Sequence, residues 1–313
     1  MAKISVIVPV HNTGVYVEQA VASLQNQSLS DIEIILVENA SSDDSLERCM
    51  DIAAKDPRIK VLHLDRGDLS LARNEGIKAA TSGFVGFMDS DDEILPEMYE
   101  VLYGMVSEHG LDLAVCNYLR DYPSGRKKYG FCEDGKVHLV SPKEMTALNL
   151  TETIPQSACV LLVRREIAVS VPFPVGMHFE DRITTFRYAA AAKACGYINR
   201  TFYLYHQYRG KICRSGSFKR NHDFAVSDMM RLEFIRNSGM FTESEMPAVS
   251  RKAAESLLRK INRMRKSCST LEERSGMEGI MAGVGLVPDG TRLSLKARII
   301  RYMVRKGIFQ KII

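Results

Sequence analysis

The chain has 313 residues, a length that allows roughly two domains. Apolar residues make up 45% of it and charged residues 26%, which excludes a wholly disordered or low-complexity protein. The formal net charge is +4, but residues 291–313 carry seven Lys or Arg and no acid, so the rest of the chain is net negative. Basic character is therefore confined to the C-terminal segment, and we expect no nucleic-acid partner.

The spacing of the cysteines and the length of the apolar runs indicate the cellular compartment. Seven cysteines stand far apart without a CxxC pair, which favours a reduced environment. No apolar run approaches the roughly 18 residues of a membrane span. The first apolar stretch contains Pro9 and runs into His11 and Asn12, so we expect a strand there and not a signal peptide. These patterns predict a cytoplasmic protein.

The N-terminal third alternates short apolar segments with segments of helical periodicity. Strands are expected at residues 4–8, 32–38, 60–64 and 84–88, and helices at residues 15–25, 44–54, 71–80 and 96–109. This alternation predicts a doubly wound, mostly parallel α/β sheet with helices on both faces. Ligands bind such sheets beyond the carboxyl ends of the strands.

The second half of the chain changes character near residue 220. Further strands are expected at residues 111–118, 158–163 and 201–208, with a helix at 179–192 and an exposed excursion or hairpin at 120–140. Beyond His222 the pattern is all-helical and increasingly basic. We therefore expect a catalytic α/β domain over residues 1–218 and a helical region over residues 219–313.

An acidic cluster, Asp89-Ser90-Asp91-Asp92, follows the fourth expected strand. Carboxylates gathered at a strand end repel one another unless a cation or ligand lies between them, and a hard divalent ion suits them. A solvated acidic turn that caps the next helix is the alternative. A calcium-binding loop is excluded, because Ile94 stands where the sharp turn of that loop needs Gly.

Two common phosphate-binding motifs are absent from the sequence. No GxGxxG follows the first strand and no GxxxxGK[ST] occurs, which disfavours a dehydrogenase and a P-loop kinase. A divalent ion at Asp89 and Asp91, with a cation such as Arg73, would hold a diphosphate without a glycine loop.

Motifs spread over residues 3–217 resemble, in the same order, those of glycosyltransferase family 2, whose catalytic domain has the GT-A fold. The matching segments are the opening strand Ile4–Asn12, the acidic turn Glu38–Ser41, the helix start Leu71–Asn74, the metal motif Asp89–Asp92, the ED motif Phe179–Asp181 with Phe186, and the closing strand from Leu204 to Arg209. The resemblance implies an inverting transfer of a sugar from a nucleotide-sugar to a hydroxyl of a glycan or lipid-linked acceptor, in bacterial surface polysaccharide synthesis.

The resemblance also implies a role for individual residues. Asp91, with Asp89 beside it, would bind Mg²⁺ or Mn²⁺. Asp181 would be the general base that takes the proton of the acceptor hydroxyl, and Glu180 would shape its pocket. The residues implied in nucleotide binding are Pro9, His11, Glu38, Asn39, Arg73, Asp89, Ser90 and Arg209.

The nucleobase end departs from the family pattern at two places. His11 stands where the family usually has Tyr or Phe, and Glu38-Asn39 stands where it usually has Asp-Asp. An imidazole can still stack on a base, and an amide both donates and accepts. We expect a UDP-linked hexose or N-acetylhexosamine as donor, bound with altered base contacts.

Other readings of the same residues stay open. Glu180 and Asp181 could be ordinary acids of a first helical turn. A nucleotide-sugar-binding protein without turnover would have no use for Asp91 and Asp181. A sugar nucleotidyltransferase would carry a basic, Gly-rich loop after the first strand, whereas residues 10–16 contain no Lys or Arg.

The C-terminal segment has the pattern of an amphipathic helix. An apolar stripe and a basic stripe alternate there, formed by Leu293, Ala297, Ile300 and Val304 and by Arg298, Arg301 and Arg305. Such a helix is suited to lying in a lipid interface. We expect residues 291–313 to bind an anionic membrane surface peripherally, at the inner face of the cytoplasmic membrane; the alternative is a helix whose apolar stripe packs on the domain.

Overall fold

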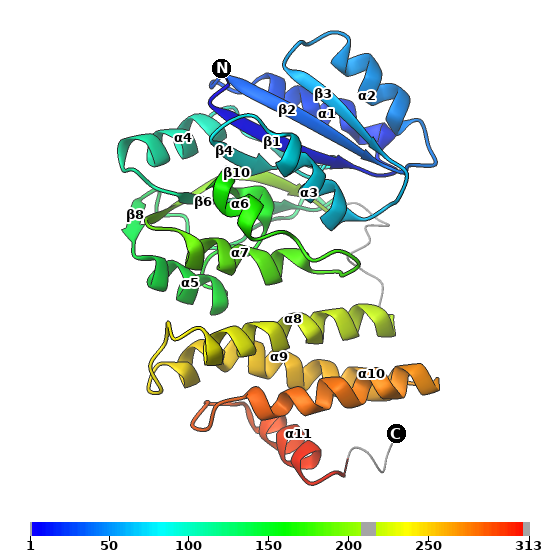
Figure 1. Cartoon of the computed structure of the whole chain (residues 1–313), viewed down its shortest axis with the longest axis vertical. Coiled ribbons are helices and arrows are strands. Elements are labelled where there is room, and N and C mark those ends of the chain that lie inside the picture. The colour runs from blue at the N-terminus through cyan, green and yellow to red at the C-terminus, as the bar shows by residue number, and fades with distance from the viewer. Residues whose placement is uncertain (1, 208–216, 309–313) are drawn as a thin grey trace. The chain divides into compact units, whose positions relative to one another are not determined.

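The computed structural model describes residues 2–207 and 217–308, and these form two compact units (Figure 1). The sheet unit contains the described residues of 1–146, 154–176 and 184–209, and the helical unit those of 147–153, 177–183 and 210–313. Two short segments that precede residue 218 thus group with the helical unit. The domain boundary expected between residues 218 and 219 is not tested by this division and stays a prediction.

Four parallel strands form the N-terminal half of the sheet. They are β1 (Ile4–Val10), β2 (Ile32–Asn39), β3 (Ile59–Leu64) and β4 (Phe84–Phe87), in the spatial order β3-β2-β1-β4. Every residue of β1 and β2 is buried, so both faces of the sheet are covered there. Such continuous apolar runs are typical of parallel strands with helices on both faces.

The rest of the sheet is mixed. β9 (Leu161–Arg164) lies antiparallel between β4 and β6 (Leu113–Asp121), and β10 (Cys195–His206) runs parallel to β6. The short strands β5 (Glu93–Ile94), β7 (Lys127–Tyr129) and β8 (Val137–Val140) pair antiparallel with β10, β6 and β10. The prediction of an α/β fold is confirmed, and the described residues form one sheet of ten strands of mixed direction.

Three of the expected strands differ from the structure by three or more residues at one end. The strand expected at 158–163 begins as a 3₁₀ turn, Ala158–Val160, and only then becomes β9. The strand expected at 201–208 begins much earlier, at Cys195, because it continues through residues that pair with β6 and β8. The strand at 111–118 continues to Asp121, where β7 turns back on it.

Seven helices of the described chain accompany the sheet. They are α1 (Gly14–Gln25), α2 (Ser45–Ala53), α3 (Leu69–Ala79), α4 (Met98–Glu108), α5 (Pro142–Leu150), α6 (Arg165–Ser170) and α7 (Glu180–Ala191). Helix α3 packs on β1 at Gly76, where a Cβ atom would lie 2.4 Å from Cγ2 of Ile7. That close approach fixes the position of the helix that carries Arg73.

The helical unit contains α8 (Phe218–Asn237), α9 (Met246–Ser267), α10 (Leu271–Ala282) and α11 (Leu295–Arg305). Side-chain caps begin three of them: Ser217 accepts from Arg220 N–H, Ser294 from Ala297 N–H, and Thr270 forms a capping box with Glu273. Leucine, isoleucine and methionine side chains fill its own core, among them Leu257, Leu258, Ile261, Met264, Met277 and Ile280.

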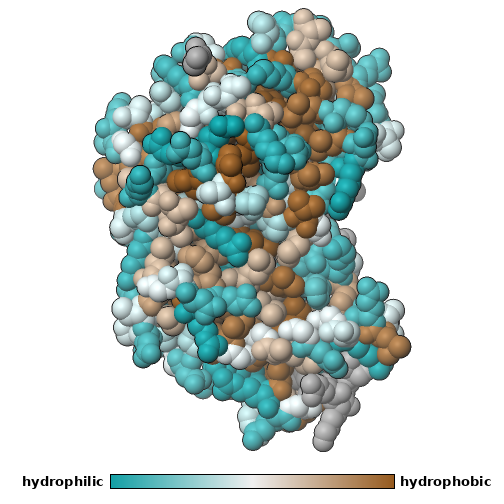
Figure 2. All heavy atoms as spheres, viewed as in Figure 1, coloured by the Kyte–Doolittle hydropathy of each residue, from teal (hydrophilic) through white to brown (hydrophobic). Residues whose placement is uncertain are grey.

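The visible surface mixes hydrophilic and apolar residues (Figure 2). Exposed large apolar side chains include those of Val15, Leu271 and Leu295. Over residues 2–207 and 217–308, no helix is both long and apolar enough to span a bilayer.

Candidate active site

The residues expected to bind the nucleotide follow three neighbouring strands. His11 comes after β1, Asn39 ends β2 and Asp89 follows β4, and these strands lie side by side in the sheet. Because the strands are parallel, their carboxyl ends share one edge. The structure thus brings the three together at the edge where a ligand of this fold class binds.

A buried arginine and a half-exposed aspartate form the charged centre of this edge. The side chain of Arg73 is 2% exposed, and its NH2 lies 3.1 Å from Oδ1 of Asp89, whose side chain is 36% exposed. The guanidinium carbon also lies 5.2 Å from the ring centroid of Phe173. A buried charge is tolerated where it is paired, and Asp89 provides the carboxylate partner of Arg73 just beneath the surface.

The last acid of the cluster is bound within the fold. Asp92 is 1% exposed, and its carboxylate accepts from the hydroxyl of Tyr203 at 2.9 Å and from His206 N–H at 2.9 Å. Burial, with Asp92 beside it, raises the pKa of Tyr203 well above its usual value, so that phenol stays a donor. The hydroxyl of Tyr203 in turn accepts from Asp89 N–H at 3.2 Å. The sequence placed Asp92 in the acidic cluster without this structural role, and it gave no sign of Tyr203.

Asp91 and Ser90 lie between these two acids. Ser90 is buried, and its hydroxyl lies 2.8 Å from that of Thr13. Asp91 is partly exposed. No group of three or more His, Cys, Asp or Glu side chains over the described ranges is arranged to hold a metal by itself. Asp91 and Asp89 carry the carboxylates that could hold an ion of the Mg²⁺ type, which binds through one or two carboxylates together with substrate phosphates.

A chain of hydrogen bonds connects the ends of β1 and β2 to the start of α3. Nδ1 of His11 lies 2.7 Å from the backbone oxygen of Asn39, and Oδ1 of Asn39 accepts from Asp68 N–H at 2.9 Å. Asp68 then caps α3 by accepting from Leu71 N–H at 2.9 Å. Pro9 is buried within β1, opposite Val37 in the register. This chain fixes His11 and Asn39 relative to the helix of Arg73.

The turn after β2 is held by a buried carboxylate. Glu38 is 1% exposed and accepts from Ser41 N–H at 2.6 Å, and one of its oxygens lies 2.5 Å from Nδ1 of His63. Burial alone would raise the pKa of Glu38, but the hydrogen bonds from Ser41 and His63 outweigh it and lower the pKa. Ala40 in this turn has a φ of 54°, a left-handed conformation costly for any residue with a Cβ.

The ED pair opens helix α7, as expected. Glu180 is buried and Asp181 is partly exposed. The preceding residue, Phe179, has a φ of 64° and packs edge-on against Phe224 with ring centroids 4.6 Å apart. These residues belong to segment 177–183, which groups with the helical unit. Arg209 lies outside the described residues.

Directly after the ED pair, Arg182 enters a buried charge network that was missed from the sequence. Its NH2 lies 2.7 Å from Asp228 and its NH1 3.0 Å from Glu152, and Arg231 lies 3.4 Å from both acids. Asp228 and Arg231 are fully buried. The only sequence signal for this network was an arginine next to the ED pair, because the partners of Arg182 lie far away in the sequence.

The pKa values in this network report how strongly it is desolvated. Burial raises the pKa of Asp228 despite the arginines, and it lowers that of Arg231 to about 10. In Glu152, burial is outweighed by Arg182 and Arg231, and the pKa falls. The two arginines and two carboxylates together leave no net charge in the interior, which makes their burial tolerable.

Comparison with known proteins agrees with this geometry. Residues 5–168 match the family described as Glycosyl transferase family 2. Glycosyltransferase GlyG of Streptococcus pneumoniae serotype 4 is 32% identical over 221 residues, which cover 68% of this chain and 73% of GlyG. A Campylobacter jejuni relative, GalNAc(5)-diNAcBac-PP-undecaprenol beta-1,3-glucosyltransferase, is 37% identical over 111 residues, 34% of this chain and 36% of its own.

The fold has a counterpart among solved structures. The crystal structure of S. aureus TarS in complex with UDP-GlcNAc aligns with a TM-score of 0.78 at 20% identity, covering 99% of this chain and 89% of that one. Fold and site together define an enzyme of the GT-A class, a glycosyltransferase. The chain belongs to glycosyltransferase family 2.

Proposed function

We propose that this glycosyltransferase moves a hexose or N-acetylhexosamine from a UDP-sugar to a hydroxyl group, with inversion at the anomeric carbon. The observation that carries the proposal is the buried Arg73 paired with the half-exposed Asp89 at the carboxyl edge of the sheet. The guanidinium and carboxylate are fixed before the donor arrives, so binding a diphosphate with its metal ion at this edge needs little reorganisation. TarS, which shares the fold, has been crystallised with UDP-GlcNAc, and this supports a uridine donor.

Metal dependence is the second part of the proposal. Asp91, with Asp89, would hold Mg²⁺ or Mn²⁺, which supplies positive charge to the leaving nucleoside diphosphate. The residues of the chain do the rest at this end: Arg73 orients the diphosphate, while His11 and Asn39 line the base pocket through the ends of β1 and β2. Pro9, Glu38 and Ser90 support that pocket from buried positions, and Arg209 is proposed as a further diphosphate contact.

The acceptor is activated by Asp181 in this proposal. Its carboxylate takes the proton of the acceptor hydroxyl, and the resulting oxygen nucleophile forms a bond to the anomeric carbon as the bond to the nucleoside diphosphate breaks. Attack on the face opposite the leaving group inverts the configuration. Glu180, buried beside it at the start of α7, would set its orientation.

We also propose that the acceptor is a glycan or lipid-linked glycan of bacterial surface polysaccharide synthesis, met at a membrane surface. The name of the Campylobacter jejuni relative includes an undecaprenol diphosphate carrier, which supports a lipid-linked acceptor. Sequence similarity to that relative covers 111 residues, about a third of each chain, so it supports the class of acceptor and not its sugar.

The donor assignment is tested with a panel of nucleotide-sugars in the presence of Mn²⁺. Thermal stabilisation and slow hydrolysis should single out UDP-sugars, since a ligand that binds the folded state raises its melting temperature. Asp91→Asn should abolish the Mn²⁺-dependent part of UDP binding in calorimetry, whereas the matched change Asp65→Asn, at an exposed position, should leave it intact.

Three results would contradict the proposal in different ways. Binding without hydrolysis or transfer would indicate a binding protein without turnover. Formation of a nucleotide-sugar from a nucleoside triphosphate and a sugar phosphate would indicate a nucleotidyltransferase. A preference for guanosine or cytidine diphosphate sugars would refute the uridine donor and leave sugar transfer standing.

A further inference from the structure

The apolar stripe expected to face lipid is used inside the helical unit. Ala297 and Ile300 of α11 are 3% and 4% exposed and belong to the core of that unit. Leu293 and Val304 are partly buried against the same core. The expectation that this stripe lies in the membrane was therefore wrong. It is the packing surface of α11.

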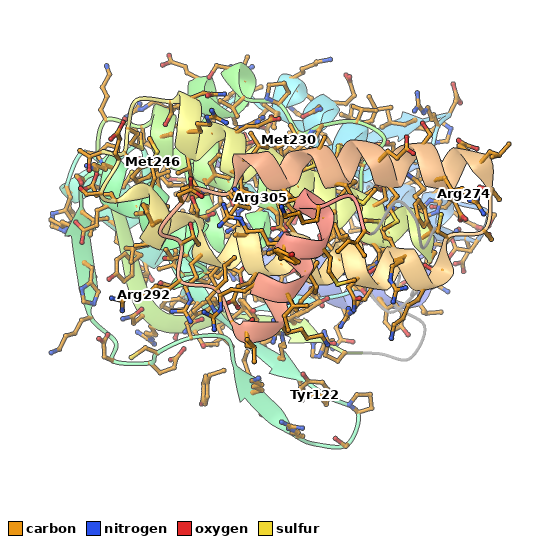
Figure 3. All side chains as sticks on the ribbon, turned by 90° about the horizontal axis from the view of Figure 1, so that it is seen from below. Tyr122, Met230, Met246, Arg274, Arg292 and Arg305 are labelled. Carbon is orange, nitrogen blue, oxygen red and sulfur yellow. The ribbon has the colours of Figure 1, made fainter. Side chains whose placement is uncertain are left out.

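The opposite face of α11 has an unusual composition. Between residues 292 and 306 the exposed positions comprise five Lys or Arg, three large apolar residues, one Ser and no acid: Arg292, Ser294, Leu295, Lys296, Arg298, Ile299, Tyr302, Arg305 and Lys306. We call these nine residues the outer face. In Figure 3 the helix α11 lies in the foreground, with Arg305 labelled on it.

The apolar members of the outer face form a line. Leu295, Ile299 and Tyr302 are 66%, 51% and 59% exposed, and their spacing of four and then three residues places them on one side of the helix. Lys296 and Arg298 flank this line on its two sides. Arg301, by contrast, turns inward, where its NH2 contacts Val287 O at 2.7 Å and Asp289 at 3.1 Å.

We infer that the outer face docks the enzyme on an anionic lipid surface. The inference rests on the proposed function, in which the acceptor is presented at a membrane. Leu, Ile and Tyr side chains can enter the headgroup region, while long Lys and Arg side chains remain among the anionic headgroups. Each basic side chain near such a surface strengthens binding about fivefold.

Charge decides between lipid and a second copy of this chain. Two copies that met through the outer face would bring five basic residues against the same five, with no acid in either face. An anionic bilayer supplies the opposite charge over the whole face. Asp289, which lies 3.5 Å from Arg305, offsets one charge at the margin and leaves the others available.

The test is co-sedimentation of the full chain with vesicles of phosphatidylcholine alone or mixed with phosphatidylglycerol. We expect binding to the mixed vesicles only, weakened by salt. The double variant Lys296→Glu/Arg298→Glu should lower partitioning at least about 25-fold, since two basic contacts are lost and two acids introduced. Ile299→Ser should lower it about tenfold by removing an inserted side chain.

A charge-matched control makes the result specific to this face. Lys55→Glu/Lys128→Glu makes the same change at exposed positions of the sheet unit and should bind the mixed vesicles as the parent does. Equal loss in the control, no loss in the outer-face variant, or a parent that ignores the vesicles but dimerises in sedimentation velocity would overturn the inference. Circular dichroism establishes that each variant is folded.

Hydrolysis of UDP-sugars in solution separates this inference from the proposed function. Residues of the outer face are not part of the proposed catalytic site, so Lys296→Glu/Arg298→Glu should hydrolyse the donor at the parental rate. Vesicle binding without hydrolysis would refute the proposed function and uphold the lipid surface. Hydrolysis without vesicle binding would refute the lipid surface and uphold the proposed function.

Discussion

At the scale of single residues, neighbouring acids of one tetrapeptide differ because their surroundings differ. Asp92 is buried and occupied by Tyr203 and His206, whereas Asp89 is half exposed and pairs with Arg73. A carboxylate with both oxygens engaged by the fold is a poor ligand for an external ion. The resemblance already implied Asp91 as the metal ligand, and that role stays a prediction. The structure adds that Asp92 is engaged by the fold, which the three similar aspartates of this tetrapeptide could not reveal.

The general base is tested at the same scale. Asp181→Asn keeps the shape of the side chain and removes its ability to accept a proton, so transfer should fall by about 10²- to 10⁴-fold. Donor affinity, measured by calorimetry, should change less than a few-fold, because donor binding is proposed to rest on other residues. Glu180→Gln is the matched control and should cost less. If Asp181→Asn retained near-parental transfer, Glu180 would become the candidate base.

At the scale of elements, the end of β2 depends on one buried carboxylate. Glu38→Gln should lower the free energy of unfolding by about 1–3 kcal/mol at pH 7, because a charged acceptor of two hydrogen bonds is replaced by an amide. The pKa of Glu38 is lowered in the fold from its usual value of about 4.5. Its contribution is therefore present above pH 4.5 and is lost as the pH falls through the folded value.

Urea unfolding at a series of pH values checks this. The difference between parent and Glu38→Gln should shrink steadily below pH 4.5. A difference that stayed constant down to the acid limit would show that the charge of Glu38 has no part in the effect. His63→Gln, which removes one partner, should reproduce part of the loss.

The first turn of α7 depends on another element, α8. Arg182→Met should lower the free energy of unfolding by about 3–5 kcal/mol, since it leaves the buried Asp228 and the partly exposed Glu152 with one arginine for two carboxylates. Asp228→Asn in the same chain should recover part of that loss, because the two side chains interact directly. Arg236→Met, at an exposed site of α8, is the control and should change stability little. Additive losses in the double variant would contradict the coupling.

At the scale of the whole molecule, the sequence predicted local elements better than it predicted which strands pair. The strands β1 to β4 and their helices follow from apolar runs and periodicity, and the parallel order of those strands follows from their alternation with helices. The antiparallel insertion of β9 between β4 and β6 could not be predicted, since an apolar run identifies a strand and not its neighbours. The grouping of segment 177–183 with the helical unit was hidden for the same reason.

For the candidate site, the order of the motifs predicted which residues lie at the carboxyl edge of the sheet. It did not predict the residues that hold them in position by hydrogen bonds and ion pairs. Arg73 and Asp89 meet as expected. The partners Asp68, Tyr203 and Glu152 carry no signal in one sequence, because each acts through a contact made by folding.

The division of the chain into two units leads to a prediction for the whole molecule. The proposed donor residues lie in the sheet unit, whereas Asp181 lies in segment 177–183, whose side chains pair with α8 through Arg182–Asp228 and His178–Asp223. A chain that stops after residue 216 should therefore bind UDP with Mn²⁺ within a few-fold of the parent. Its transfer activity should fall about as far as that of Asp181→Asn, by 10²- to 10⁴-fold.

Complementation decides whether the loss comes from α7 itself. Residues 217–313 supplied by co-expression should restore transfer, because they return Asp223 and Asp228 to the first turn of α7. The same fragment should not restore transfer to a shortened chain that carries Arg182→Met, since the ion pair between Arg182 and Asp228 cannot form. Calorimetry of UDP binding and a radiolabelled transfer assay measure the two parts separately. A shortened chain that transferred sugar at the parental rate would show that the proposed base needs no support from α8. A shortened chain that failed to bind UDP would show that the donor site is not confined to the sheet unit.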